Sequence, residues 1–164
     1  MKPWITAYIG LGSNLHQPLL QVQEAIEELN HHRHLKNLQV SPIYTSKPVG
    51  PQDQPDFINA VASFETQLGP HDLLDVLQSL EQEHGRIRKR HWGERTLDLD
   101  LLTYGRAEIH TPRLTVPHPL LFERSFVLYP FNDLAPNFPF NNGLTLNHYL
   151  QLVAFDLVAV KNGN

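Results

Sequence analysis

The sequence predicts an α+β fold of the ferredoxin-like type, a two-layer sandwich in which helices pack on a mostly antiparallel sheet. Hydrophobic patterning gives the order strand, helix, strand, strand, helix, strand, which is the order of that fold. The 164 residues suit one domain of ordinary size with a core of its own. No internal repeat and no linker interrupts them, so we expect a single domain over residues 1–164.

The first half of the chain supplies a strand, a helix and a second strand. Residues 4–12, WITAYIGLG, form a short apolar run that ends in glycines, which is typical of a buried strand. Apolar residues over 15–29 recur near every 3.6 positions and predict an amphipathic helix, capped near Ser13 or Asn14. Residues 38–45, LQVSPIYT, predict the second strand, and a loop stiffened by prolines follows.

The second half completes the motif. Residues 57–66, FINAVASFET, alternate between two faces as a strand does. A helix is expected to start at Gly69-Pro70 and to close at Gly85. Residues 97–104 predict the last strand.

The chain after residue 105 is rich in proline. Its patterning predicts two further helices, near residues 124–134 and 145–153. Residues 137–164 contain no motif that assigns them a role.

Composition excludes several classes of function. The chain has no cysteine, so it can form neither a disulfide nor a thiolate metal site or nucleophile. The formal net charge of −4 argues against general nucleic-acid binding. No run approaches the roughly 18 apolar residues of a membrane span, and the N-terminal apolar run is too short for a signal peptide. We therefore expect a cytoplasmic monomer with no nucleic-acid or membrane partner.

Two aspartates lie in the most strand-like segment. Side chains at i and i+2 of a strand point the same way, roughly 7 Å apart, so Asp98 and Asp100 share one face. Leu97, Leu99 and Leu101 share the other. The aspartates could form a solvated outer face over core leucines, or they could hold hard cations such as Mg²⁺ together with phosphate oxygens. The spacing alone does not choose between these interpretations.

The basic segment that precedes the acidic pair favours the metal site. Its cations lie within ten residues: Arg86, Arg88, Lys89, Arg90, His91 and Arg95. A run of cations is usually a solvated face, but cations beside a Mg²⁺ site suit a polyphosphate substrate. Gly85 and Gly93 would let the segment move over a site. A nucleic-acid patch is the rival interpretation, and the acidic total disfavours it.

Other motifs are weak or absent. No P-loop motif occurs, and GLGSNL at 10–15 lacks the third glycine of a dinucleotide fingerprint. HHRH at 31–34 is interpreted as a surface turn. His118 has no local triad partner, and no G-x-S-x-G is present, so nucleophilic hydrolase chemistry is disfavoured.

The segment HWGERTLDLDLL, residues 91–102, resembles the signature of the 6-hydroxymethyl-7,8-dihydropterin pyrophosphokinase family. Further matching segments occur in order over roughly residues 7–136: YIGLGSNL at 8–15, GPQDQPDFINAV at 50–61, E-x-x-x-G-R-x-R at 81–88 and RLTVPHPLLFERSFVLYPF at 113–131. The resemblance implies transfer of pyrophosphate from ATP, the co-substrate, to 6-hydroxymethyl-7,8-dihydropterin. The products are AMP and the pterin diphosphate, in a step of folate biosynthesis.

The resemblance also implies a catalytic group. Asp98 and Asp100 are expected to hold two Mg²⁺ ions that bridge the triphosphate. Arg86 and Arg95 are expected to lie nearest the transferred phosphates. The hydroxyl of the pterin would attack the β-phosphorus, and Asp98 is a candidate acceptor of its proton, directly or through a metal-bound ligand.

For the pterin, the resemblance implies a polar edge and aromatic faces. Asn59 is expected to bind the ring edge, Phe126 to stack on the ring and Trp92 to close over it. The full expected set is Ser46, Val49, Phe57, Asn59, Trp92, Asp98 and Phe126. Lys47 departs from the apolar residue expected in this loop.

For ATP, the resemblance implies a largely basic set: Gln78, Glu81, Arg86, Arg88, Arg95, Leu101, Arg113, Thr115, His118 and Arg124. Gln78 and Glu81 are three apart and are expected to share a helix face. His118 is expected to donate to a phosphate oxygen. Two rival classes remain at this point, a small-molecule binding module without catalysis and a metal-dependent phosphohydrolase.

Overall fold

The computed structural model describes residues 2–48, 50–85 and 96–160. The elements follow one another as β1 (Ile5–Ser13), α1 (Pro18–Asn30), β2 (Leu35–Val40), β3 (Tyr44–Ser46), β4 (Phe57–Thr66), α2 (Pro70–Glu83), β5 (Asp98–Tyr104), β6 (Ile109–His110), β7 (Thr115–Val116), the 3-10 turn η1 (Leu121–Glu123), α3 (Ser125–Leu134), α4 (Leu146–Leu150) and β8 (Val158–Ala159). Each strand and helix expected from residues 4 to 104 is present.

The main sheet has the strand order β5-β1-β4-β3-β8, and β2 also pairs with β4. The pairings are antiparallel. With α1 and α2 packed on this sheet, the structure confirms the predicted α+β fold with a mostly antiparallel sheet.

The single strand expected over residues 38–45 is divided into β2 and β3. Both pair with β4, β2 along its C-terminal half and β3 along its N-terminal end. Pro42 lies between them and has no N–H to donate to a ladder. Ser41 maintains the connection instead, because its Oγ accepts a hydrogen bond from the backbone N–H of Val61 at 2.9 Å.

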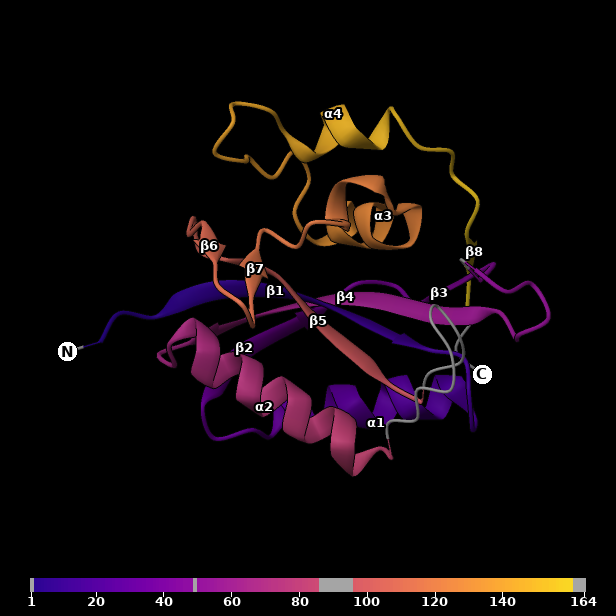
Figure 1. Ribbon diagram of the computed structural model, residues 1–164, viewed down its shortest axis with the longest axis horizontal. Coiled ribbons are helices and arrows are strands. Elements are labelled where there is room, and N and C mark those ends of the chain that lie inside the picture. Colours follow the sequence, from indigo (N-terminus) through magenta and orange to yellow (C-terminus); the bar gives the residue numbers. More distant parts are fainter. Residues whose placement is uncertain (1, 49, 86–95, 161–164) are drawn as a thin grey trace.

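Apolar cores lie on both faces of the sheet. Figure 1 shows α1 and α2 on one face and α3 and α4 on the other, so the C-terminal helices add a layer to the predicted sandwich. Leu99 and Phe64 belong to the core under α1 and α2. Val61 and Leu102 belong to the core under α3 and α4. Strand β4 is therefore buried along most of both its faces.

Two details at the ends of elements differ from expectation or add to it. The predicted helix cap at Ser13 or Asn14 is wrong, because β1 runs to Ser13 and α1 begins only at Pro18. At the C-terminal end, β8 pairs with β3 and extends the sheet. Within the described parts of the chain, no helix combines the length and apolar character needed to span a bilayer.

Candidate functional site

The acidic pair lies on the α3 side of the sheet. Leu99 and Leu101, which alternate with the aspartates along β5, are buried in the core beneath α1 and α2, so Asp98 and Asp100 point to the opposite face. Both aspartates are half-buried. Across the ladder, Asp98 pairs with Gly12 and Asp100 pairs with Gly10. Strand β1 thus places no side chain beside either carboxylate.

Gly12 also separates Asp98 from Asn59. Asn59 of β4 is the ladder partner of Gly12 on its other side. Since neighbouring strands lie about 4.8 Å apart, the Cα atoms of Asn59 and Asp98 are roughly 10 Å apart across the glycine. A Cβ on Gly12 would lie 3.2 Å from Asn59 Nδ2 and 4.0 Å from Phe57 Cδ1. Gly12 therefore leaves a position without a side chain, here called the gap, between the Asp98 carboxylate and the Asn59 amide. The amide nitrogen lies close over this position, and the Phe57 ring lies near it.

The Asn59 amide is held in a defined orientation. Ser46 of the adjacent strand β3 donates from Oγ to Asn59 Oδ1 at 2.6 Å, and both side chains are buried. The amide nitrogen therefore lies on the Gly12 side, toward the gap. The structure thus brings together the predicted pterin residues Ser46, Phe57 and Asn59.

Arg124 lies beside the acidic pair, at the end of η1. Burial lowers the pKa of the Arg124 guanidinium, while the negative charges of Asp100, Asp98 and Glu123 act in the opposite direction. Its Cζ lies 5.4 Å from the ring centroid of Phe126, so the cation also contacts an aromatic face. This arrangement gives the site a cation next to both aspartates.

His118 is positioned by its own backbone and that of Leu120. The backbone N–H of His118 donates to the carbonyl of Leu102 at 2.9 Å. The backbone N–H of Leu120 donates to the ring nitrogen Nδ1 of His118 at 3.2 Å. Burial lowers the pKa of His118, Asp100 raises it and Arg124 lowers it. The lowered pKa favours the neutral ring, and in that form the bond to Nδ1 places the proton on Nε2, which is then a donor.

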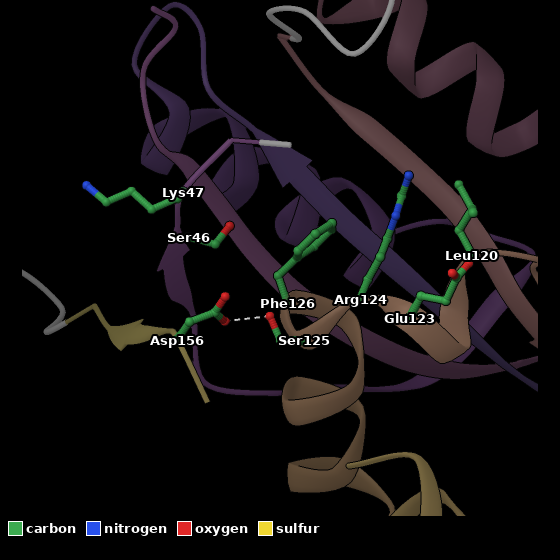
Figure 2. A pocket seen from close by; sticks show the side chains of 8 residues that line it. All are labelled: Ser46, Lys47, Leu120, Glu123, Arg124, Ser125, Phe126 and Asp156. Atoms are coloured by element: carbon green, nitrogen blue, oxygen red, sulfur yellow. Dashed lines mark hydrogen bonds between the residues drawn. The ribbon is translucent and has the colours of Figure 1, made fainter. Parts of the chain in front are cut away.

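A pocket of about 300 Å³ lies beside Arg124 and Phe126 (Figure 2). It is lined by Ser46, Lys47, Leu120, Glu123, Arg124, Ser125, Phe126 and Asp156. Figure 2 shows Phe126 between Ser46 and Arg124. Ser125 donates from Oγ to Asp156 Oδ1 at 2.5 Å, which brings the C-terminal segment to the pocket wall. Asp156 was missed because no motif marks that segment.

The remaining ATP-site predictions fall into different environments. Glu81 is buried, and its Oε2 accepts the backbone N–H of Leu99 at 2.8 Å, between the two aspartates of β5. Gln78 is exposed, and with Asp75 it accepts hydrogen bonds from Arg113 Nη2, at 3.1 Å and 2.6 Å. Gln78 and Arg113 are thus brought together, and Asp75 is a neighbour that sequence reasoning missed.

Two further predictions have less direct support from geometry. The Leu101 side chain is buried in the core, away from the acidic face, so only its backbone could contact a ligand. Thr115 is half-buried in the short strand β7. Five predicted residues lie outside the described part of the chain: Val49, Arg86, Arg88, Trp92 and Arg95.

Comparison with known proteins decides the family. Residues 8–136 match the family model described as 7,8-dihydro-6-hydroxymethylpterin-pyrophosphokinase. The chain belongs to this family. It is therefore a pyrophosphokinase of folate biosynthesis, in a family that uses ATP and acts on a pterin.

Curated relatives agree over nearly the whole chain. The chain is 46% identical to the 2-amino-4-hydroxy-6-hydroxymethyldihydropteridine pyrophosphokinase of Haemophilus influenzae over 150 residues, which is 92% of this chain and 94% of that protein. It is also 46% identical to the Pseudomonas aeruginosa enzyme of the same name over 149 residues, 91% of this chain and 92% of that one.

Solved structures show the same fold. The wild-type HPPK-DHPS of Plasmodium falciparum, crystallised with pteroate, matches 93% of this chain with a TM-score of 0.71 at 14% identity. The match covers 43% of that chain, so this chain corresponds to less than half of the Plasmodium protein. At this identity the match supports the fold alone.

Proposed function

We propose that this pyrophosphokinase binds the pterin over the gap at Gly12 and the triphosphate over Asp98 and Asp100, so that the pterin hydroxymethyl oxygen attacks the β-phosphorus of ATP. The products are AMP and the pterin diphosphate. One observation supports this arrangement above the others: Asn59, Gly12 and Asp98 lie in one row across three strands. The glycine leaves no side chain between the amide and the carboxylate of this row.

On the pterin side, a polar edge and aromatic faces meet. Asn59 offers Nδ2 toward the gap, and Ser46 fixes that orientation. Phe57 lies near the gap, and Phe126 lines the neighbouring pocket. We assign these residues to the pterin, together with Asp98 and, from outside the described residues, Val49 and Trp92. Asp98 is the candidate proton acceptor because it is the carboxylate in the row that contains Asn59.

Between the substrates, Asp98 and Asp100 suit Mg²⁺. Their ligands are carboxylate oxygens, which hard cations prefer. Among the described residues no cluster of three or more His, Cys, Asp or Glu side chains could hold a metal. A two-carboxylate set fits ions that keep waters and take phosphate oxygens as further ligands, and two such ions are proposed. When bound, Mg²⁺ supplies neutralisation of charge on the phosphates.

On the ATP side, the chain supplies cations and donors. Arg124 lies next to the acidic pair, and His118 offers Nε2–H in the same region. Arg113, with Gln78, forms an exposed site farther along α2. Glu81 acts through β5, since it binds the backbone between the aspartates. The remaining assignments to ATP are Leu101 through its backbone, Thr115, Arg86, Arg88 and Arg95. The protein's contribution is positioning and electrostatic stabilisation.

An assay with ATP, Mg²⁺ and 6-hydroxymethyl-7,8-dihydropterin that resolves AMP from ADP tests this proposal. AMP formed only in the presence of the pterin is the expected result. ADP and phosphate formed without the pterin would indicate a phosphohydrolase instead. No nucleotide consumption would indicate a binding module. We also propose that the enzyme acts as a monomer, which sedimentation equilibrium would check.

A further inference from the structure

Two buried amides join β1 to the proline-rich loop beyond the end of the sheet. The β1–β4 ladder ends at the pair Ser13 and Ile58. Asn14, the residue that follows β1, donates from Nδ2 to Gln54 Oε1 and to the carbonyl of Pro55, both at 2.9 Å. Side-chain bonds thus continue the connection where backbone pairing stops.

Both amides are deeply buried and both are used in the connection. Asn14 is 1% exposed and Gln54 is 6% exposed. Gln54 also donates from Nε2 to the carbonyl of Pro51 at 2.9 Å, which closes the turn within the loop. Removing either amide would take a hydrogen-bond partner from the buried side chain of the other, which is more costly than losing an exposed hydrogen bond. The amide pair therefore fixes the loop against β1.

The fixed loop leads directly into the pterin side of the site. Asn14 follows Gly12 by two residues, and Gln54 precedes Phe57 by three and Asn59 by five. The neighbouring Ser13 donates from Oγ to the carbonyl of Thr96 at 2.5 Å, two residues before Asp98. The same end of β1 thus contacts the loop on the pterin side and the strand of the acidic pair.

We propose that Asn14 and Gln54 are positioning residues for the pterin: they set the loop that leads to Phe57 and Asn59 at a fixed distance from Gly12. This inference rests on the proposed pterin site at Asn59. A displacement of the loop would move Phe57 and the Asn59 end of β4 relative to the acidic pair, and small displacements of a bound substrate reduce reactivity strongly.

The test uses two glutamines of the same loop. Gln54→Met keeps the length of the side chain and its packing but removes both amide bonds. Gln52→Met is the matched control, since Gln52 is exposed and, within the described residues, donates to the carbonyls of Pro48 and Gly50 in its own loop. Calorimetric titration would measure the pterin Kd on full-length protein saturated with a non-hydrolysable ATP analogue, and the analogue Kd separately, alongside thermal unfolding.

Gln54→Met is expected to raise the pterin Kd by about tenfold and to leave the Kd of the ATP analogue within about twofold. Gln52→Met is expected to change neither by more than about twofold. Asn14→Leu should match Gln54→Met, and the double variant should be little worse than either, because both remove one connection. Should Gln54→Met fold poorly, Gln54→Glu keeps the acceptor for Asn14 and is expected to give a smaller rise.

Other outcomes would overturn the proposal in distinguishable ways. Equal weakening of both ligands, in step with a lower Tm, would show that the amide pair is merely structural. Asn59→Ala distinguishes failure of the positioning role from failure of the proposed pterin site. If Asn59→Ala weakens pterin binding and neither Gln54 variant does, the positioning role is wrong. If Asn59→Ala leaves pterin binding unchanged, the proposed pterin site itself is wrong.

Discussion

The two faces of the sheet are made from the same central strands, yet they are used differently. Beneath α1 and α2 the strands present aliphatic and aromatic side chains along their length. Beneath α3 the apolar core includes Tyr8, Val61 and Leu102. Toward the far ends of the strands it gives way to a polar row, in which half-buried Asp98 pairs across the ladder with the buried Gly12. The comparison shows how one alternating pattern can build a continuous core on one face and a substrate site on the other.

The largest effect expected from this difference is on the acidic face. Asp100→Ala should lower kcat by at least about a thousandfold, because it removes a proposed metal ligand beside Arg124. The free energy of unfolding should fall only modestly, since Asp100 is half-buried and Asp98 and Glu123 remain as negative charges near Arg124. Steady-state kinetics and urea unfolding check both statements. Near-wild-type turnover would refute the proposed metal site.

Leu99, between the two aspartates, should affect stability strongly and activity weakly when it is replaced. Leu99 is 3% exposed on the core face, so Leu99→Ala should lower the free energy of unfolding by about 2–5 kcal/mol. Activity per folded molecule should fall by only a few-fold, since the backbone N–H that Glu81 accepts is retained. Urea unfolding and active-site titration at low temperature separate the two quantities. A large loss of activity in fully folded Leu99→Ala would mean that the two faces are not independent.

The β1 glycines allow a finer test on the acidic face. Gly12→Ala places a Cβ 3.2 Å from Asn59 Nδ2, which is tight, whereas a Cβ on Gly10 meets Leu102 at 3.7 Å, an ordinary contact. Gly12→Ala is expected to raise the pterin Kd by about tenfold, and Gly10→Ala by no more than about twofold. Equal effects of the two variants would mean that the gap at Gly12 does not define the pterin site.

The same comparison shows what could be read from the sequence. The core face was predictable because alternation in residues 57–66 and 97–104 depends only on local period. On the acidic face, the sequence predicted that the side chains of Asp98 and Asp100 point to the same side of the sheet. The coverage of that face was not, because the helices predicted near residues 124–134 and 145–153 could not be assigned to a face of the sheet.

Side-chain connections across long sequence separations were the least predictable features. Asn14 was expected to cap a helix, yet it bonds to Gln54, 40 residues away. The break between β2 and β3 follows from Pro42. The hydrogen bond from the Val61 N–H to the Ser41 hydroxyl, which spans this break, depends on tertiary placement. Asp156 lies at the pocket wall, where it accepts a hydrogen bond from Ser125, 31 residues away in the sequence. Local periodicity contains no information about such contacts.

The smallest expected effect concerns the attachment of α3 to the acidic face. The hydroxyl of Tyr44, on β3, donates to Asp133 of α3. Burial, together with the hydrogen bond and the charge of Asp133, raises the pKa of Tyr44 to about 12. The neutral phenol is the stabilising form, so its contribution is complete below the unfolded-state pKa of about 10 and is lost as the pH rises through 12.

Tyr44→Phe should therefore remove part of the alkaline decline in stability. Between pH 10 and pH 12 the free energy of unfolding of the wild type should fall more steeply than that of Tyr44→Phe, and the difference between the two proteins should shrink with rising pH. Urea unfolding over this range measures it. Tyr149→Phe is the control, because the Tyr149 hydroxyl accepts a hydrogen bond from the neutral side chain of Asn142. Parallel pH profiles for wild type and Tyr44→Phe would show that α3 is held to the sheet by its apolar contacts alone.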